Sequence, residues 1–229
     1  MSVVTISRQF GAAGVPIARE LAKRLDAEFL DRALVAQVAM RAGIDESELE
    51  SYDERLPSLW QRVAAALNTG SPELAMPSSP YLDQISQLGT HDRLVAITKA
   101  VIEEAAERGN AVIVGRGGAF ILAGRPGVLH VQLHASLDAR IRYLTSRVED
   151  IPPDARPDIG GLKDLAKSVD AARAEYIRGL FNADWLDPRH YDLSIDTGTM
   201  GVDATIAVIE AAANAVAPTA AMPPAAQAE

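Results

Sequence analysis

Short apolar runs alternate with amphipathic stretches along most of the chain. The runs expected to form strands are 3–6, 28–31, 111–114, 128–133 and 193–196, and apolar residues at helical spacing predict helices over about 16–25, 31–41, 91–108, 137–147, 163–181 and 201–215. Strands separated by helices pair in parallel, because parallel neighbours need a crossover connection. We therefore expect an α/β protein with a parallel sheet and helices on both of its faces.

One internal segment and the last residues depart from this pattern. Between residues 44 and 90 the helical periodicity is irregular, and several prolines and glycines interrupt it. We interpret 44–90 as a helical insertion that also contains a loop. Residues 217–229 are rich in Ala and Pro and lack an apolar face, which predicts a disordered tail. The remainder, residues 1–216, is expected to form a single domain.

The composition narrows the classes of function. The 229 residues include no cysteine, which excludes disulfides, thiolate nucleophiles and Cys-ligated metal sites. Because 31 acidic residues outnumber 22 basic ones and the net charge is −9, a nucleic-acid-binding surface is not expected. The N-terminus lacks the pattern of a signal peptide, and no apolar run approaches the roughly 20 residues of a membrane span. We expect a cytoplasmic protein that binds neither nucleic acid nor membrane.

A glycine-containing loop, Ser7–Gly14, lies between the first expected strand and the first expected helix. Backbone N–H groups of such a turn and of the following helix start can bind phosphate oxygens. In the phosphate-binding pattern GxxxxGK[ST], a lysine and then a hydroxyl residue follow the second glycine. If Gly14 is that glycine, Val15 stands at the lysine position and Pro16 at the Ser/Thr position. The loop is therefore either a degenerate phosphate-binding loop or only a tight connection.

Arginines follow two later strands of the expected sheet. Arg116 stands among glycines in the loop 115–118, where its planar guanidinium suits a phosphate group, although a turn with one solvated arginine has the same sequence. Arg140 lies in the helix after the next strand. Asp170 and Arg173 are three residues apart in a later helix, a spacing that also fits a surface ion pair. Because ligands of open parallel sheets bind beyond the carboxyl ends of the strands, these arginines are candidate anion ligands.

Three segments carry a family resemblance. They are the opening Ile6-Ser7-Arg8-Gln9-Phe10-Gly11-Ala12-Ala13-Gly14, the strand and loop 112–118, and the run 170–176 followed by 184–188 and 191–197. In this order, and over most of residues 3–210, the chain resembles the cytidylate kinase-like family, relatives of bacterial cytidylate kinases. The resemblance implies a P-loop kinase-like fold and ATP-dependent phosphoryl transfer to a nucleoside monophosphate, with magnesium. It also places the insertion 44–90 near the phosphoryl acceptor.

The same resemblance implies roles for individual residues. The donor phosphates would lie on Ser7, Gly11, Ala12, Ala13, Gly14, Val15 and Pro16, the acceptor would contact Asp31, Arg116, Gly117 and Asp170, and Arg140 and Arg173 would stabilise charge on the transferred group. Apart from the resemblance, Arg8 in the same loop is our candidate for the cation that Val15 does not supply. Such chemistry requires mainly positioning and charge neutralisation from side chains. No residue is assigned as a metal ligand.

Two positions depart from the family pattern. True cytidylate kinases carry the P-loop lysine where this chain has Val15, and an acidic residue where it has Gly117. Loss of a cation beside transferring phosphates slows such reactions by orders of magnitude. Two alternatives therefore stay open, namely a nucleotide-binding or regulatory protein that has lost catalysis, and a kinase for a non-nucleotide small molecule. The oligomeric state is open as well, a homodimer included.

Overall fold

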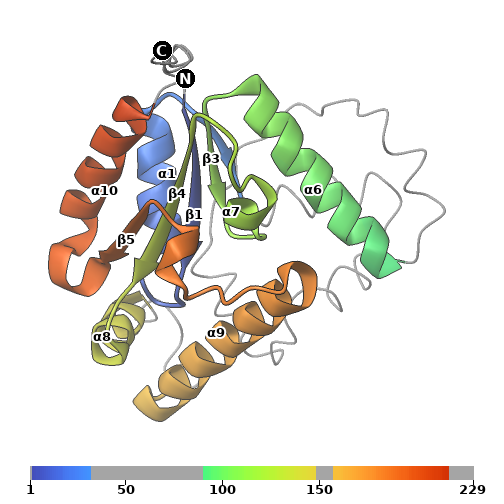
Figure 1. Ribbon diagram of the computed structural model, residues 1–229. Helices are drawn as coiled ribbons and strands as arrows, with labels where there is room; N and C mark the ends of the chain where they lie inside the picture. Colours follow the sequence, from blue (N-terminus) through green and yellow to red (C-terminus); the bar gives the residue numbers. More distant parts are fainter. Residues whose placement is uncertain (1, 32–89, 148–156, 217–229) are drawn as a thin grey trace, which may run out of the picture.

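The computed structural model describes residues 2–31, 90–147 and 157–216 (Figure 1). Its centre is a five-stranded sheet in the order β2-β3-β1-β4-β5, and every neighbouring pair of strands is parallel. The strands are β1 (Val3–Arg8), β2 (Glu28–Leu30), β3 (Ala111–Val114), β4 (Val128–His134) and β5 (Leu193–Asp196). The parallel sheet expected from the alternating pattern is confirmed.

Helices cover both faces of this sheet. They are α1 (Gly14–Arg24), α6 (Thr90–Arg108), α7 (Gly118–Ile121), α8 (Leu137–Arg147), α9 (Ile159–Phe181) and α10 (Thr197–Ala215), with a 3₁₀ turn, η1, at Pro188–His190. Figure 1 shows α1 and α10 on one face, α6 and α7 on the other, and α8 and α9 beyond the carboxyl ends of the strands. In this arrangement α9 lies next to the loops after β1 and β3, where a ligand of a parallel sheet is expected.

Two apolar cores lie on the two faces of the sheet. The core under α1 and α10 joins residues such as Val4, Ile17 and Ile209, which are fully buried. The core under α6 and α7 joins Ile97, Ile113 and other buried residues. Because strands in the middle of a parallel sheet are covered on both faces, they consist of continuous apolar runs, and this is why 111–114 could be recognised as a strand.

The register of the central strand brings the functional loops together. Ile6 of β1 pairs with Val114 of β3, and Arg8 pairs with Leu133 of β4. The loop after β1 therefore starts beside the loop after β3, at the same edge of the sheet. The amide of Gly115 donates to the carbonyl of Ile6 at 2.9 Å, which fixes the first residue of the β3 loop against β1.

Two helices begin earlier than the apolar spacing predicts, because aspartates cap them. Asp158 accepts from the Gly161 amide at 2.7 Å, so α9 starts at Ile159. Asp196 accepts from the Gly198 amide at 2.9 Å, so α10 starts at Thr197 and is kinked at Gly201, where the sequence pattern had placed its start. The short helix α7 was not predicted, because four residues are too few to show a helical period.

Several predictions fall on residues that the structure does not describe. The helix expected to follow Asp31, the insertion 44–90 up to residue 89 and the tail 217–229 all lie outside the described residues, so the single-domain prediction stays untested. Among the helices that are described, none combines the length and the apolar character needed to cross a membrane.

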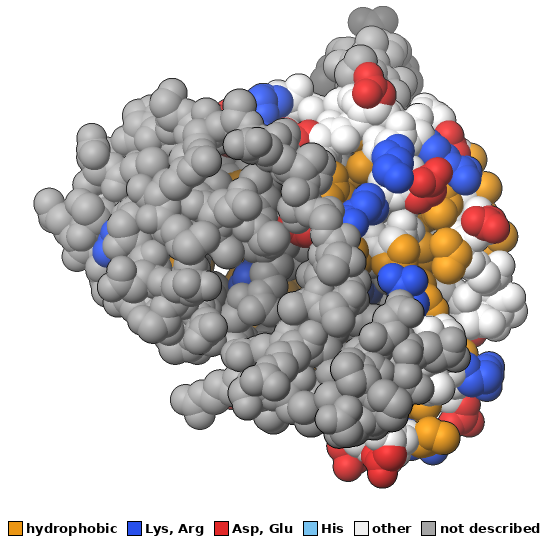
Figure 2. All heavy atoms as spheres, turned by 180° about the vertical axis from the view of Figure 1, so that it is seen from behind, with side chains coloured by type: hydrophobic (Ala, Val, Ile, Leu, Met, Phe, Trp, Pro, Cys, Tyr) orange, Lys and Arg blue, Asp and Glu red, His pale blue; other side chains and the backbone are white. Residues whose placement is uncertain are grey.

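Charged side chains of both signs are interspersed on the described part of the face that Figure 2 shows. Figure 2, which shows the molecule from behind, has basic and acidic groups next to one another rather than gathered by sign. Ion pairs on α1 are of this kind, since Arg24 lies 3.4 Å from both Glu20 and Glu210, and Lys23 lies 3.8 Å from Glu20. Such exposed pairs contribute only about 0–1 kcal/mol each to stability.

Candidate active site

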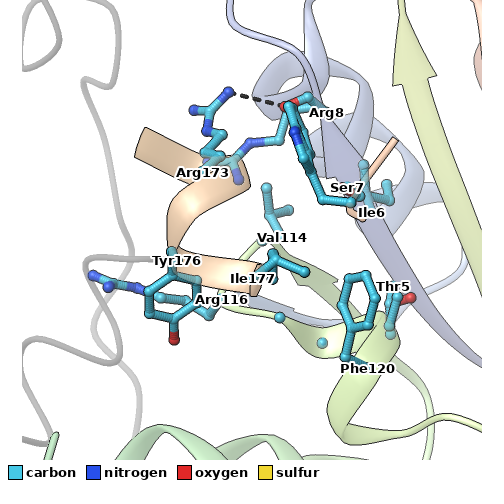
Figure 3. Close-up of a pocket in the computed structure, with 15 residues that line it drawn as sticks. Thr5, Ile6, Ser7, Arg8, Val114, Arg116, Phe120, Arg173, Tyr176 and Ile177 are labelled. Carbon is cyan, nitrogen blue, oxygen red and sulfur yellow. Dashed lines mark hydrogen bonds between the residues drawn. The ribbon is translucent and has the colours of Figure 1, made fainter. Parts of the chain in front are cut away.

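A cavity of about 110 Å³ opens at the carboxyl ends of β1 and β3 (Figure 3). Three arginines from three different elements line it, Arg8 from the end of β1, Arg116 from the loop after β3 and Arg173 from α9. No Asp or Glu is among its described lining residues. In a chain of net charge −9, this gathering of guanidinium groups makes the cavity a candidate site for an anion.

Arg8 crosses from the start of α1 to the loop after β3. A Cβ atom on Gly14 would lie 2.6 Å from Arg8 Cγ and 2.9 Å from Arg8 Cβ, so the aliphatic stem of Arg8 packs directly on Gly14. A Cβ on Gly115 would collide with the guanidinium of Arg8. These two glycines therefore make room for one arginine, whose charged end stands between the two glycine loops.

The loop 9–14 forms a tight turn that contains two residues with positive φ. Gly11 has φ +84° and Ala13 has φ +54°, and the Ala12 amide donates to the Gln9 carbonyl at 3.2 Å. The first turn of α1 follows at once, and its first hydrogen bond runs from the Ile17 amide to the Ala13 carbonyl. The N–H groups ahead of that bond have no partner within the helix and can bind phosphate oxygens.

The start of α1 also shows which groups are missing relative to the P-loop pattern, namely one N–H at Pro16 and one positive charge at Val15. Gly14 and Val15 each have an N–H ahead of the first helical hydrogen bond, whereas Pro16 has none and is exposed. Val15 carries no charge. The free N–H groups of the loop suit an anion, but a cation has to come from outside α1, and Arg8 is the arginine that packs on Gly14.

The side chains of Gln9 and Thr197 tie the loop to the end of β4 and the start of α10. Gln9 Oε1 accepts from the Ala135 amide at 3.2 Å. The hydroxyl of Thr197 lies 3.2 Å from the carbonyls of both Ala12 and His134. The roles of Gln9 and Thr197 were not recognised from the sequence, although both stand in segments that carry the family resemblance.

Arg140 and Asp170 meet at the loop but do not line the cavity. Asp170 Oδ1 accepts from the Phe10 amide at 2.8 Å, and Arg140 Nη1 donates to Asp170 Oδ2 and, at 3.1 Å, to the Phe10 carbonyl. The two side chains are 9% and 15% exposed. Arg173 joins both sites, because it donates to the Arg8 carbonyl at 2.9 Å and lies 3.7 Å from Asp170.

A hydrogen-bonded wall supports the inner side of the cavity. The carbonyl of Trp185 accepts from Gln132 Nε2 at 2.8 Å and from the Tyr191 hydroxyl at 2.7 Å, and that hydroxyl also lies 3.2 Å from Ser7 Oγ. Burial raises the pKa of the Tyr191 hydroxyl above its usual value of 10.0, so it stays protonated and able to donate. The contact between Tyr191 and Ser7 joins residues 184 positions apart and therefore leaves no local signal in the sequence.

Gly117 has a steric reason to lack a side chain. Its φ is +72°, and a Cβ there would lie 2.7 Å from Cε2 of Phe181. Phe181 is in turn stacked on Phe120, with ring centroids 5.3 Å apart. The position at which cytidylate kinases carry an acidic residue is therefore closed by an aromatic pair in this chain.

The structure brings part of the predicted site together. The predicted residues that line the cavity are Ser7, Arg8, Arg116, Gly117 and Arg173. The loop residues Gly11, Ala12, Ala13, Gly14, Val15 and Pro16 lie beyond Arg8, around the start of α1, and Arg140 and Asp170 lie behind the loop. Asp31 follows β2, two strands away from β1, and is buried. Within the described residues, no group of three or more His, Asp or Glu side chains is placed to hold a metal ion.

Comparison with known proteins identifies the family. The model of the cytidylate kinase-like family matches residues 3–199. The fold is similar to an uncharacterized protein from Eubacterium ventriosum ATCC 27560, at 19% identity and a TM-score of 0.62, with 93% of this chain and 99% of that chain covered. It is also similar to a shikimate kinase from Bacteroides thetaiotaomicron, at 14% identity and a TM-score of 0.50, with coverages of 93% and 98%. None of the curated proteins matches the sequence. The chain belongs to the cytidylate kinase-like family and has the fold of the P-loop kinases.

Proposed function

We propose that this protein is a kinase that transfers a phosphoryl group from ATP to a nucleoside monophosphate. Family membership and the P-loop kinase fold support kinase-type phosphoryl transfer. The observation that carries the proposal is the cavity at the carboxyl ends of β1 and β3, where Arg8, Arg116 and Arg173 line one space next to the glycine loop. A phosphate on the acceptor and the phosphates of the donor both require such a concentration of positive charge.

The residues divide this work between donor and acceptor. The N–H groups of the loop and of the first turn of α1 would bind the donor phosphates, and Arg116 would bind the acceptor phosphate. Arg8, which contacts both Gly14 and Gly115, and Arg173, which donates to the Arg8 carbonyl, would stabilise the charge that develops during transfer and replace the missing lysine. ATP with Mg²⁺ supplies the phosphoryl group and part of its charge neutralisation, and since Mg²⁺ usually keeps several waters and substrate oxygens, it needs few protein ligands.

A coupled assay tests the proposal directly. The full chain is incubated with ATP and Mg²⁺ and with each nucleoside monophosphate in turn, and ADP formation is followed. We expect turnover with at least one of them. Arg116→Ala should then raise the KM for that acceptor and leave the KM for ATP unchanged, whereas Arg142→Ala, at an exposed position of α8, should change neither. Absence of turnover with every nucleoside monophosphate would contradict the proposal.

Two other functions are favoured by particular observations. Val15 and Pro16 at the start of α1 favour a protein that binds a nucleotide without transferring its phosphate. Calorimetry would then detect ATP binding, and the coupled assay would detect no ADP formation. The similarity of the fold to a shikimate kinase favours a kinase with a small hydroxylated acid as acceptor. Shikimate therefore belongs in the same acceptor screen, and turnover with it alone would select this second alternative.

A further inference from the structure

The backbone of Phe10 is held on both sides by one ion pair. Its N–H donates to Asp170 Oδ1 at 2.8 Å, and its carbonyl accepts from Arg140 at 3.1 Å, while Arg140 also donates to the other carboxylate oxygen of Asp170. We propose that Asp170 and Arg140 are positioning residues that hold the donor loop 9–14 in its phosphate-binding shape and touch neither substrate. This inference rests on the proposed kinase function for the identity of the ligand. The clamp, by which we mean the contacts of Asp170 and Arg140 with the backbone of Phe10, can be tested without turnover.

Side-chain packing also holds the loop against α8 and α9. The ring of Phe10 packs against an apolar cluster in which α8 meets α9, formed by Ile141, Leu144, Leu162 and Ala166. Gly11, the next residue, has φ +84°, and a Cβ there would lie only 3.0 Å from Arg140 Cβ. Arg140 therefore contacts the loop with its stem as well as with its guanidinium. Loop, α8 and α9 form one packed unit.

The same contacts keep Arg140 and Asp170 away from a substrate role. Both side chains are largely buried, at 9% and 15% exposure, and neither lines the cavity. A phosphate that displaced Asp170 from Arg140 would leave a buried carboxylate beside another anion, which is unfavourable. The sequence resemblance assigned Asp170 to the acceptor and Arg140 to the transferred group; the geometry points to support of the donor loop.

The helix α9 extends this support to the cavity. Three residues after Asp170, Arg173 donates to the Arg8 carbonyl at 2.9 Å, and Tyr176 and Ile177 in the next turn line the cavity. Loss of the contacts of Asp170 and Arg140 with Phe10 should therefore weaken ATP binding first. Arg8 immediately precedes the loop 9–14 and Phe10 is part of it, and this loop is the proposed donor site. A direct role of Asp170 at the acceptor predicts the opposite, a change in acceptor affinity alone.

Asp170→Ala, Asp170→Asn and the control Asp164→Ala separate these two roles. Asp164 is exposed on the same helix and serves as the matched control. KM values for ATP and for the acceptor are measured, together with hydrogen exchange of the amides of residues 10–15 in the substrate-free protein. For Asp170→Ala we expect the KM for ATP to rise and these amides to exchange faster, each by about ten- to a hundredfold, as for the loss of hydrogen bonds to a charged group. The acceptor KM should stay within about twofold.

The conservative variant sharpens the result. Asp170→Asn keeps an oxygen that can accept from the Phe10 amide, so its effects should be intermediate, and Asp164→Ala should behave as the unchanged protein. A rise in acceptor KM with unchanged exchange of residues 10–15 would overturn the proposal. If the unchanged protein has no kinase activity, the proposed function fails, and exchange alone decides whether the clamp exists.

A second variant covers the case in which Asp170→Ala does not fold. Arg140→Lys retains a charge for Asp170 but lacks the fork that reaches the carboxylate and the Phe10 carbonyl together. Faster exchange at residues 10–15 with unchanged exchange in β5 would support the clamp. Unchanged exchange at residues 10–15 in this folded variant would contradict it.

Discussion

Arginines at the carboxyl edge of this sheet occur in two different environments. Arg140 is buried with a carboxylate and a carbonyl as partners, so its charge is neutralised and its geometry fixed. Arg8 and Arg116 line a cavity that has no Asp or Glu among its described lining residues, and Arg173 stands between the two environments. The same residue type therefore supports the loop in one place and lines the cavity in the other, and the elements packed around each side chain decide which.

The largest effect on stability is expected in the clamp. Arg140→Met leaves the largely buried Asp170 without its main ion-pair partner, and we expect the free energy of unfolding to fall by about 3 kcal/mol, the lower end of what a broken buried pair costs. The lower end applies because Asp170 keeps the Phe10 amide and remains 3.7 Å from Arg173. Denaturant unfolding measures this. Arg142→Met, on the exposed side of α8, is the control, and a loss as small as in that control would break the distinction.

The corresponding change in the cavity should affect turnover instead. Arg8→Met keeps an aliphatic stem on Gly14 and removes the guanidinium, so we expect kcat to fall about 100- to 1,000-fold, as for the loss of one preorganised donor at a developing charge. Steady-state kinetics and denaturant unfolding are measured on the same preparation. Unchanged kcat, or a stability loss as large as that of Arg140→Met, would show that Arg8 is a structural arginine too.

Gly14→Ala tests the packing between loop and cavity. The added Cβ would lie 2.6 Å from Arg8 Cγ, so Arg8 has to move, and we expect a stability loss of about 1–3 kcal/mol together with reduced turnover. In the double variant with Arg8→Ala the nearest contact is gone, and the stability loss should be smaller than the sum of the two single losses. Strict additivity in this double-mutant cycle would mean that the stem of Arg8 does not lie on Gly14.

A smaller effect is expected at the wall of the cavity. Tyr191→Phe removes the hydroxyl that contacts Ser7 and the Trp185 carbonyl, which should cost about 1 kcal/mol of stability because Trp185 keeps its bond from Gln132. Tyr143→Phe is the matched control, since no hydrogen bond of its hydroxyl is seen among the described residues. Equal losses of stability in the two variants would show that the Tyr191 hydroxyl and its contact with Ser7 do not stabilise the fold.

The smallest expected effect is a pH dependence that involves neither arginine group. Burial lowers the pKa of His130 below 6.5, against the opposing charge of Asp192, so the unfolded chain takes up a proton that the native ring resists. The free energy of unfolding should therefore decrease as the pH falls below 6.5, and His130→Asn should reduce this slope. The pKa of Asp187 is lowered to about 2 by Arg189, and that of Asp196 is lowered by Thr199. These two carboxyl groups therefore change the free energy of unfolding only at a pH well below that at which His130 titrates. An unchanged slope in the variant would contradict this assignment.

The fold was accessible to sequence analysis because its signals are local. Continuous apolar runs such as 111–114 identify buried strands, and the glycines around them mark the loops at the functional edge. The helix starts at Ile159 and Thr197 were placed too late, because a capping aspartate adds a turn that apolar spacing does not show.

Which arginines line the cavity and which support the loop could not be predicted from the sequence in the same way. Arg140 and Arg173 are 33 residues apart and both follow the family pattern, yet only Arg173 lines the cavity. What distinguishes them is a contact between Phe10 and Asp170, which are 160 residues apart in the chain. Gly117 is a similar case, since the reason for its missing side chain is the ring of Phe181, and no short-range pattern encodes that contact.

The central claim is that the arginine-lined cavity beside the glycine loop binds the phosphates. A crystal structure of the full chain with a non-hydrolysable ATP analogue, Mg²⁺ and the acceptor tests it most directly. We expect the donor phosphates on the N–H groups at the start of α1, with the guanidinium of Arg8, Arg116 or Arg173 within hydrogen-bond distance of a phosphate oxygen. Phosphates bound away from these three side chains, or a bound nucleotide whose phosphates displace Asp170 from Arg140, would contradict it.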